Sequence, residues 1–195
     1  ADSYEQVAAI DPAKREITLT PPYHNYGYRK GQPFYAVNAL SELDEPGEWF
    51  LDRARSRILF LPPSNPDHAV IELSVVNVPF VELKDASNIA FEGLTWQMGC
   101  TDAIAFTRGT NCLLAGCTVR QFAGNGVVIS GGTGDGILAS DLHTLGRGGV
   151  VLVGGDRKTL APGGHYVDNC QIYDLSRIDH TYTPAVLVSG VGQHI

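Results

Sequence analysis

Hydrophobic residues recur in pairs along the second half of the chain, with one residue between the two members of each pair. Two apolar residues at this spacing form one buried face of a β-strand. A fixed step of 20 to 50 residues is typical of a solenoid, in which each repeat stacks on the next. Successive pairs lie 23 residues apart: Val81 and Leu83, Ile104 and Phe106, Val127 and Ile129, Val150 and Leu152. We therefore predict a right-handed parallel β-helix over residues 78–195, with about five coils and an incomplete last coil.

Each repeat contains two further short apolar segments, so that a coil has three strands. Small residues or asparagine separate these two segments and are expected to turn the chain: Gly93, Gly116, Ala139 and Asn169. The second strands are expected to point inward through Ile89 and Phe91, Cys112 and Leu114, and Asp135 and Ile137. The third strands are expected to point inward through Leu94 and Trp96, Cys117 and Val119, Ser140 and Leu142, and Cys170 and Ile172.

The repeat is longer in two places. The fourth coil carries extra residues between Val153 and Tyr166, and a second long loop runs from Ser176 to Ala185. The first loop leaves the first strand of coil four and the second enters the first strand of coil five, so both flank the same sheet. Insertions into single repeats often carry function in solenoids. We predict that the two loops wall a groove across this sheet.

Residues 1–77 lack the repeat and are richer in proline and charge. Two segments there resemble each other, Ala9–Leu19 and Phe50–Leu61, and each reads as a strand, a turn opened by an aspartate, and a strand. An aspartate side chain can close such a turn on backbone N–H groups. We expect a small antiparallel β subdomain, similar to a barrel or sandwich, over residues 1–77.

Composition excludes several functional classes. The net charge of −7 and the absence of a basic stripe argue against a nucleic-acid partner. No apolar run is long enough to predict a membrane span. The four cysteines lack the spacing of a metal site, which leaves buried thiols or a disulfide. His143 and His165 are too isolated for a zinc site, and we expect neither a metal ion nor a cofactor.

The two long loops hold the candidate site residues. Asp156 and Asp179 are their only acidic residues, and a pair of carboxylates across a groove is what glycoside hydrolysis requires. We therefore take both as candidate catalytic residues, with loop ordering by hydrogen bonds and ion pairs as the alternative role. The candidate substrate-binding residues in the same loops are Arg157, Lys158, His165, Arg177, His180 and Tyr182.

Three stretches resemble a group of bacterial right-handed parallel β-helix proteins. They are Phe34–Pro63, which contains EPGEWFLD, then Gly154–Arg177, which contains GGDRKTLAPGG, and Tyr182–Ile195. Many members of this group are secreted enzymes that degrade polysaccharides. The nearest classes are glycoside hydrolase families 141, with fucosidase and xylanase activities, and 120, which contains β-xylosidases. The resemblance implies a secreted or periplasmic protein that hydrolyses an oligo- or polysaccharide with a pair of acidic residues on the helix.

Two other functions stay open. A polysaccharide lyase or epimerase uses the same fold and needs a base near a uronate, for which Lys158 or Arg177 is suitable. The third is a non-catalytic carbohydrate-binding or structural module. Only Glu82 is acidic among the first-strand residues expected to face solvent, and the chain stops in mid-coil at Ile195, so we expect a piece of a longer protein with further catalytic residues outside it. Those outward residues are Glu82, Ala105, Val128, Val151 and Val186.

Overall fold

The computed structural model describes residues 2–195 and divides into two compact units. One unit is Tyr4–Glu72, and the other is Leu73–Ile195 together with Asp2 and Ser3. Both units are built from β-strands, and the helical structure in the described chain consists of two short 3-10 turns, η1 (Leu40–Glu42) and η2 (Pro66–His68). Within residues 2–195, the structure contains no helix with the length and apolar character needed to cross a bilayer.

The unit Tyr4–Glu72 holds two antiparallel hairpins, and each of them is a separate two-stranded sheet. The turns form as predicted, because Asp11 Oδ1 accepts the backbone N–H of Lys14 and Asp52 Oδ1 accepts that of Arg55, both at 3.1 Å. No strand pairing joins the hairpins within the described residues, and a barrel or sandwich stays a prediction. The strands are β1 (Val7–Asp11), β2 (Glu16–Leu19), β3 (Trp49–Asp52) and β4 (Arg57–Phe60).

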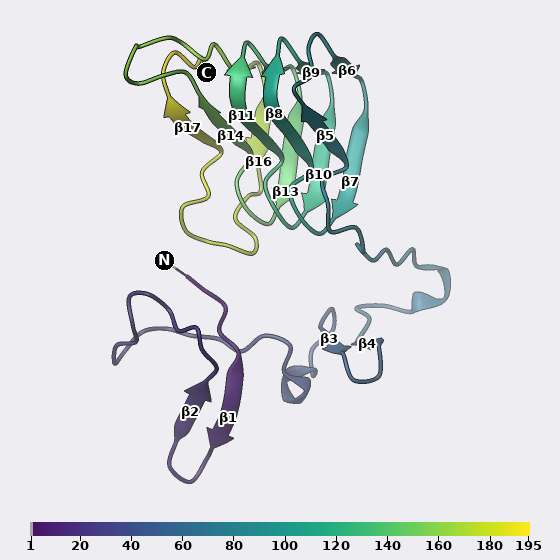
Figure 1. Ribbon diagram of the computed structural model, residues 1–195. Helices are drawn as coiled ribbons and strands as arrows, with labels where there is room; N and C mark the ends of the chain where they lie inside the picture. Colours follow the sequence, from purple (N-terminus) through teal and green to yellow (C-terminus); the bar gives the residue numbers. More distant parts are fainter. Residues whose placement is uncertain (1) are drawn as a thin grey trace. The chain divides into compact units, whose positions relative to one another are not determined.

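The second unit is a β-solenoid of stacked parallel strands, as the 23-residue repeat predicts (Figure 1). The first strands of the coils form a five-stranded first sheet, and the other strands form a second and a third sheet of four strands each. The first sheet contains β5 (Val81–Lys84), β8 (Ile104–Thr110), β11 (Val127–Thr133), β14 (Val150–Gly154) and β17 (Val186–Gly190). The second contains β6 (Ala90–Glu92), β9 (Leu113–Ala115), β12 (Gly136–Leu138) and β15 (Tyr166–Asp168). The third contains β7 (Thr95–Gly99), β10 (Thr118–Phe122), β13 (Asp141–Leu145) and β16 (Gln171–Tyr173).

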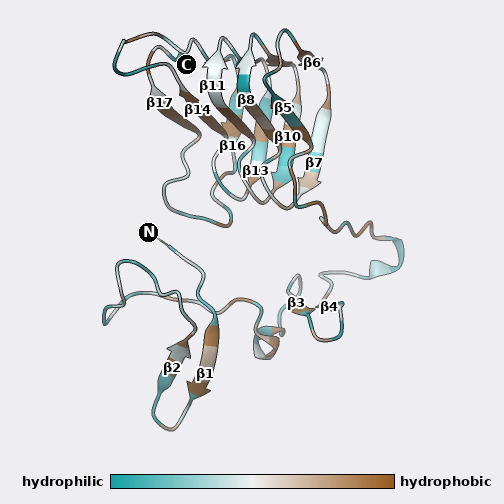
Figure 2. Ribbon diagram, in the orientation of Figure 1, coloured by the Kyte–Doolittle hydropathy of each residue, from teal (hydrophilic) through white to brown (hydrophobic). Residues whose placement is uncertain are grey.

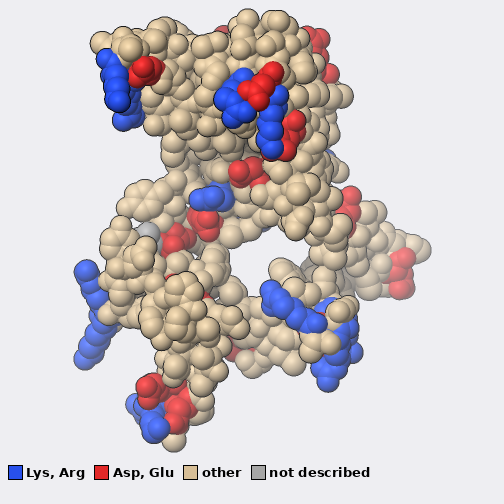
Figure 3. Space-filling model, viewed as in Figure 1, with Lys and Arg blue, Asp and Glu red and all other residues tan. Residues whose placement is uncertain are grey.

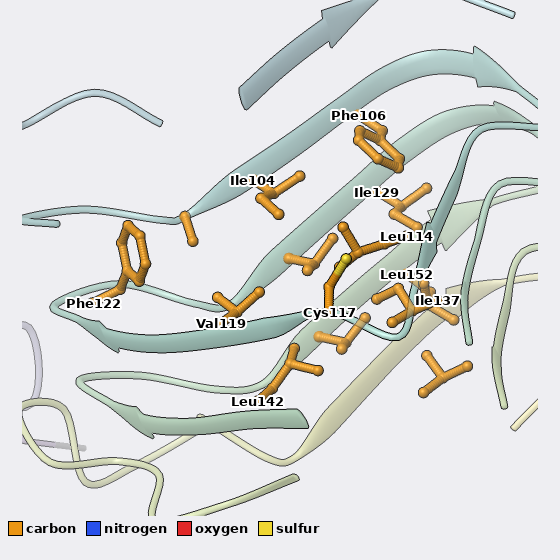
Figure 4. Packing of buried hydrophobic residues seen from close by; sticks show 14 of the residues in the cluster. Ile104, Phe106, Leu114, Cys117, Val119, Phe122, Ile129, Ile137, Leu142 and Leu152 are labelled. Carbon is orange, nitrogen blue, oxygen red and sulfur yellow. The ribbon is translucent and has the colours of Figure 1, made fainter. Parts of the chain in front are cut away.

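The register of the strands places equivalent apolar residues of successive coils above one another. Ile104 pairs with Val127 and Phe106 with Ile129 across β8 and β11, and all four side chains are fully buried. Figure 4 shows Ile104, Phe106 and Ile129 of the first sheet pointing into one interior. Leu114 and Ile137 of the second sheet and Val119 and Leu142 of the third point into the same interior (Figure 4). Period-two strands from three directions thus fill a single core, since each inward residue packs on its counterpart one strand above.

The predicted turns between the second and third strands are confirmed by their backbone angles. Gly93, Gly116, Ala139 and Asn169 all have positive φ, between 47° and 65°. This left-handed region suits glycine and tolerates asparagine. All four cysteines are free thiols, and Cys112 and Cys117 lie in the core.

One register prediction is wrong. Val186 pairs with Val150 and packs against the core, whereas Leu187 occupies the outward position beside Val151. The first strands of coils four and five are therefore 36 residues apart, from Val150 to Val186. The outward position predicted for Val186 is off by one residue because the long second loop hides the register. The strand β14 is hydrophobic, as its brown colour shows (Figure 2).

Candidate functional site

An open groove of about 630 Å³ lies over the ends of three adjacent strands of the first sheet, β11, β14 and β17. Its floor includes Ser130, Val153 and Ser189, which are register partners on these strands and point outward. Beyond them, the floor continues as backbone rich in glycine, because Gly131, Gly132, Gly154 and Gly190 all line the groove. Glycine lets a ligand approach the main chain closely.

The first long loop forms one wall of this groove. Asp156, Arg157, Ala161 and Pro162 line it from this loop. The loop is closed by a bridge in which the Asp156 N–H donates to the Ala161 carbonyl at 2.9 Å. Charged residues gather over this loop, which leaves β14 at the upper left of Figure 1 (Figure 3).

The Asp156 carboxylate is engaged by its own loop. Oδ1 accepts the N–H of Lys158 at 2.8 Å, and Oδ2 accepts the Thr159 hydroxyl at 3.0 Å. These hydrogen bonds lower the pKa of Asp156, with the Lys158 N–H as the largest cause. Because a general acid needs a raised pKa, this environment suits an ionised acceptor, base or nucleophile. It also matches the loop-ordering role expected as the alternative for this residue.

Arg157 reaches across the groove toward β17. Its Nη2 donates to Ser189 Oγ at 3.3 Å, which leaves most of its five N–H donors free for a ligand. It is the only basic residue that lines the groove among the described residues. Lys158 is exposed on the same loop but does not line the groove.

The second long loop lies at the other end of the first sheet. Its Asp179 pairs with Arg147, with 2.9 Å between Oδ2 and Nε, and its main chain bonds to the carbonyl of Gly146. Both Gly146 and Arg147 precede β14, whereas Asp156 follows it. The two loops therefore flank the same sheet, as predicted, but they do so from opposite ends of its strands (Figure 1).

This placement separates the two candidate carboxylates. The five residues of β14 lie between them, and a strand of that length spans about 13 Å. Catalytic carboxylate pairs of glycosidases lie roughly 5 to 9.5 Å apart. The structure does not bring Asp156 and Asp179 together, and the catalytic role of each stays a prediction.

The remaining candidates of the second loop are also remote from the groove. Arg177 lies 3.8 Å from Asp174, and Tyr182 is 79% exposed. The His180 N–H donates to Asp2 Oδ2 at 2.6 Å, and the Thr181 hydroxyl donates to Oδ1 of the same carboxylate. These contacts tie the loop to the N-terminal segment, and no residue of the loop lines the groove.

His165 ends the first loop and is fully buried, so it does not line the groove. It stacks within the solenoid on Asp135, which is also fully buried. The Asp135 N–H donates to His165 Nδ1 at 3.2 Å, and Asp135 Oδ2 lies 3.9 Å from the same nitrogen. Burial lowers the pKa of His165 and raises that of Asp135. Direct contact of His165 with substrate stays a prediction.

The groove is also lined by three hydroxyl residues that the sequence did not single out, Ser130, Thr133 and Ser189. Ser130 and Ser189 follow the apolar pairs of their strands by one residue, and this position repeats along the chain. The repeat therefore held a signal for both. Among the described residues, no three His, Cys, Asp or Glu side chains are grouped as a metal site would need.

Comparison with protein-family models, curated proteins and solved structures gives no match. The resemblance to glycoside hydrolase families 141 and 120 therefore rests on the quoted sequence stretches. The fold itself rests on the strand register.

Proposed function

We propose that this protein is a carbohydrate-active β-solenoid protein, and that its groove binds a segment of an oligo- or polysaccharide. The observation that carries this proposal is the open groove beside the first long loop. Hydroxyl, guanidinium and carboxylate groups surround its floor, which is rich in glycine. Sugars present hydroxyls that both donate and accept hydrogen bonds. Ser130, Thr133 and Ser189 do the same, Arg157 donates and Asp156 accepts.

Glycoside hydrolysis is the reaction we propose for the bound chain, in line with the family resemblance. Asp156 is the carboxylate in the groove, and its lowered pKa keeps it ionised at neutral pH. An ionised carboxylate serves as the nucleophile or as the base that activates water. Protonation of the leaving oxygen then requires a second acidic group on the other side of the scissile bond.

A non-catalytic binding module is the second candidate. The observation that favours it is that Asp156 is the single acidic residue lining the groove among the described residues, while hydrolysis needs two. Binding alone requires only the groove and its polar groups.

Titration calorimetry with xylan, fucosylated and uronate-containing oligosaccharides tests binding. Arg157→Ala should weaken binding about tenfold, since a hydrogen bond to a charged donor is worth about 1.5 kcal/mol. Arg177→Ala is the matched control, an exposed arginine of the other loop, and should leave affinity unchanged. Binding by none of these sugars, or equal losses in both variants, would contradict the proposal.

Product analysis then separates the two candidates. Hydrolysis releases reducing ends without an unsaturated product, and Asp156→Asn should abolish this release while keeping the fold. A lyase would instead yield unsaturated ends that absorb in the ultraviolet. Sugar binding with no turnover supports the non-catalytic module. An Asp156→Asn variant that keeps its rate but melts earlier would leave this residue with the loop-ordering role alone.

A further inference from the structure

Asp135 and His165 lie directly behind the glycine floor of the groove. Asp135 is in the turn between β11 and β12, and His165 is in the turn before β15. A Cβ atom added at Gly154 would lie 2.6 Å from His165 Nε2, so the imidazole packs against the inner side of a groove residue. Glycine at this position leaves the ring its space.

Both side chains carry a buried polar atom that is not satisfied. Asp135 Oδ2 and His165 Nε2 are inaccessible to solvent and have no hydrogen-bond partner. A buried unpaired polar atom is costly and rare in a native structure. Two such atoms in one pair beneath a candidate site call for a functional reason.

The hydrogen bonds of the pair define which state one imidazole nitrogen adopts. His165 Nδ1 accepts the Asp135 N–H, so this nitrogen carries no proton. Asp135 Oδ1 accepts the N–H of Cys112 at 2.8 Å, while Oδ2 faces Nδ1 at 3.9 Å. A proton on Nδ1 would remove the acceptor for the Asp135 N–H and provide a donor for Oδ2. The ring and the carboxylate would then approach by about 1 Å, since charge-assisted N–H···O bonds are about 2.8 Å long.

The pair is connected to two sides of the groove floor, by the main chain on one side and by hydrogen bonds on the other. Along the main chain, one residue separates Asp135 from the floor residues Gly131, Gly132 and Thr133. The His165 N–H donates to Gln193 Oε1 at 3.1 Å, and Gln193 Nε2 donates to the carbonyl of Gly154 at 2.8 Å. A shift of the Asp135–His165 pair is therefore transmitted to the floor from β11 and from β14.

We propose that Asp135 and His165 are positioning residues for the groove, and that they hold its floor in the ligand-binding form only while His165 Nδ1 is unprotonated. Uptake of one proton from solvent converts the pair to an ion pair and distorts the floor. This inference rests on the proposed carbohydrate binding for its effect on affinity. The coupling of the pair to the floor is independent of any sugar, because it stands on the main chain after β11 and on the hydrogen bonds of Gln193.

Few other groups near the pair titrate. Cys112 contacts Asp135 through its N–H, and the main-chain N–H of His194 donates to the carbonyl of His165 at 2.9 Å. Arg108 of β8 packs against Gly131 and is held by Asp85 through two hydrogen bonds of 2.6 Å. Arg108 keeps its charge throughout the range tested, and Asp85, whose pKa this pairing lowers, stays ionised. His194 is itself a histidine and its main chain contacts His165, so the His165→Gln variant, and not the pH range alone, assigns the response to the pair.

Amide NMR spectra of the full chain, recorded from pH 7.5 to 4.5, test the coupling without any sugar. The amides of Gly131, Gly132 and Gly154 should shift together with the His165 ring. The midpoint should lie below pH 6.5, because burial lowers the pKa of this histidine. His165→Gln should abolish the shifts, and His143→Gln, on the third sheet, should leave them intact. Asp135→Asn retains the Oδ1 acceptor and serves as a second variant if His165→Gln does not fold.

Affinity provides the second readout. For the best sugar ligand, binding should weaken about tenfold from pH 7 to pH 5, as expected for the loss of about one hydrogen bond. The ratio of the affinity at pH 7 to the affinity at pH 5 should be close to one in His165→Gln. In His143→Gln this ratio should equal that of the wild type. The inference would be overturned if the floor amides did not shift with the His165 ring, or if they still shifted with pH in His165→Gln. If no sugar binds but the amides follow His165, the proposed function fails while the positioning role stands.

Discussion

The two long loops of the solenoid differ in what they contact, although both interrupt the same repeat beside the same sheet. The first, after β14, closes on itself through Asp156 and faces an open groove. The second, before β17, is fastened to Gly146, Arg147 and Asp2. An insertion whose polar groups are used to fix its own position has few left for a ligand. An insertion in this solenoid therefore indicates a site only where it borders a groove.

Exchanging the tip of each loop for two glycines should produce the largest contrast. Asp156 and Ala161 already form an antiparallel bridge, so two residues can replace residues 157–160 and close the turn. Sugar binding should fall by more than about tenfold, since Arg157 alone is expected to contribute that much. The same exchange of residues 180–182 should leave affinity as it is, measured by calorimetry. Equal losses in the two variants would remove the distinction between the loops.

Glycine at the end of β17 is required by the close approach of two strands at the groove floor. Gly190 has φ of +112°, and an added Cβ would collide with the carbonyl of Gly154. Gly190→Ala should lower the free energy of unfolding by about 3 kcal/mol, combining backbone strain with overpacking. Gly116→Ala is the matched control, because its φ is also positive but the space around it is open; it should cost about 1 kcal/mol. Urea unfolding measures both, and similar costs would show that the floor is not tightly packed.

The ion pair of the second loop should matter little. Arg147 and Asp179 are half-exposed, and exposed pairs contribute at most about 1 kcal/mol. Asp179→Asn should therefore change the free energy of unfolding by less than this and leave sugar affinity unaltered. A loss of turnover with affinity preserved would instead restore Asp179 as a catalytic residue.

Acid should release the second loop from the N-terminal segment. The Thr181 hydroxyl and the His180 N–H lower the pKa of Asp2 from 3.8 to about 2. Because the folded pKa is depressed, the stabilising effect is complete above pH 3.8 and disappears as the pH falls through about 2. The protection of the His180 amide against hydrogen exchange, relative to an unfolded chain at the same pH, should fall in that range. In Asp2→Asn this loss of protection should be absent. A protection in the wild type that does not change with pH would contradict the assignment.

The regular part of the fold was predictable because period two and period 23 act together. Ile104, Phe106 and Leu114 each occupy the interior position that these periods require. The site was less predictable. The sequence shows that the loops of Asp156 and Asp179 interrupt the repeat. It does not show that the two loops lie at opposite ends of the strands, because this follows only from the register. Asp135 shows the same limit: its inward position was predicted from the repeat, whereas its pairing with His165 depends on a coil that is seven residues longer.

Amide and side-chain NMR mapping of a bound oligosaccharide on the full chain tests the central claim most directly. If the groove is the ligand site, the resonances of Ser130, Thr133, Arg157 and Ser189 should shift with one common saturation curve, and those of Arg177, His180 and Tyr182 should not move. Shifts confined to the second loop, or spread equally over both loops, would contradict the account.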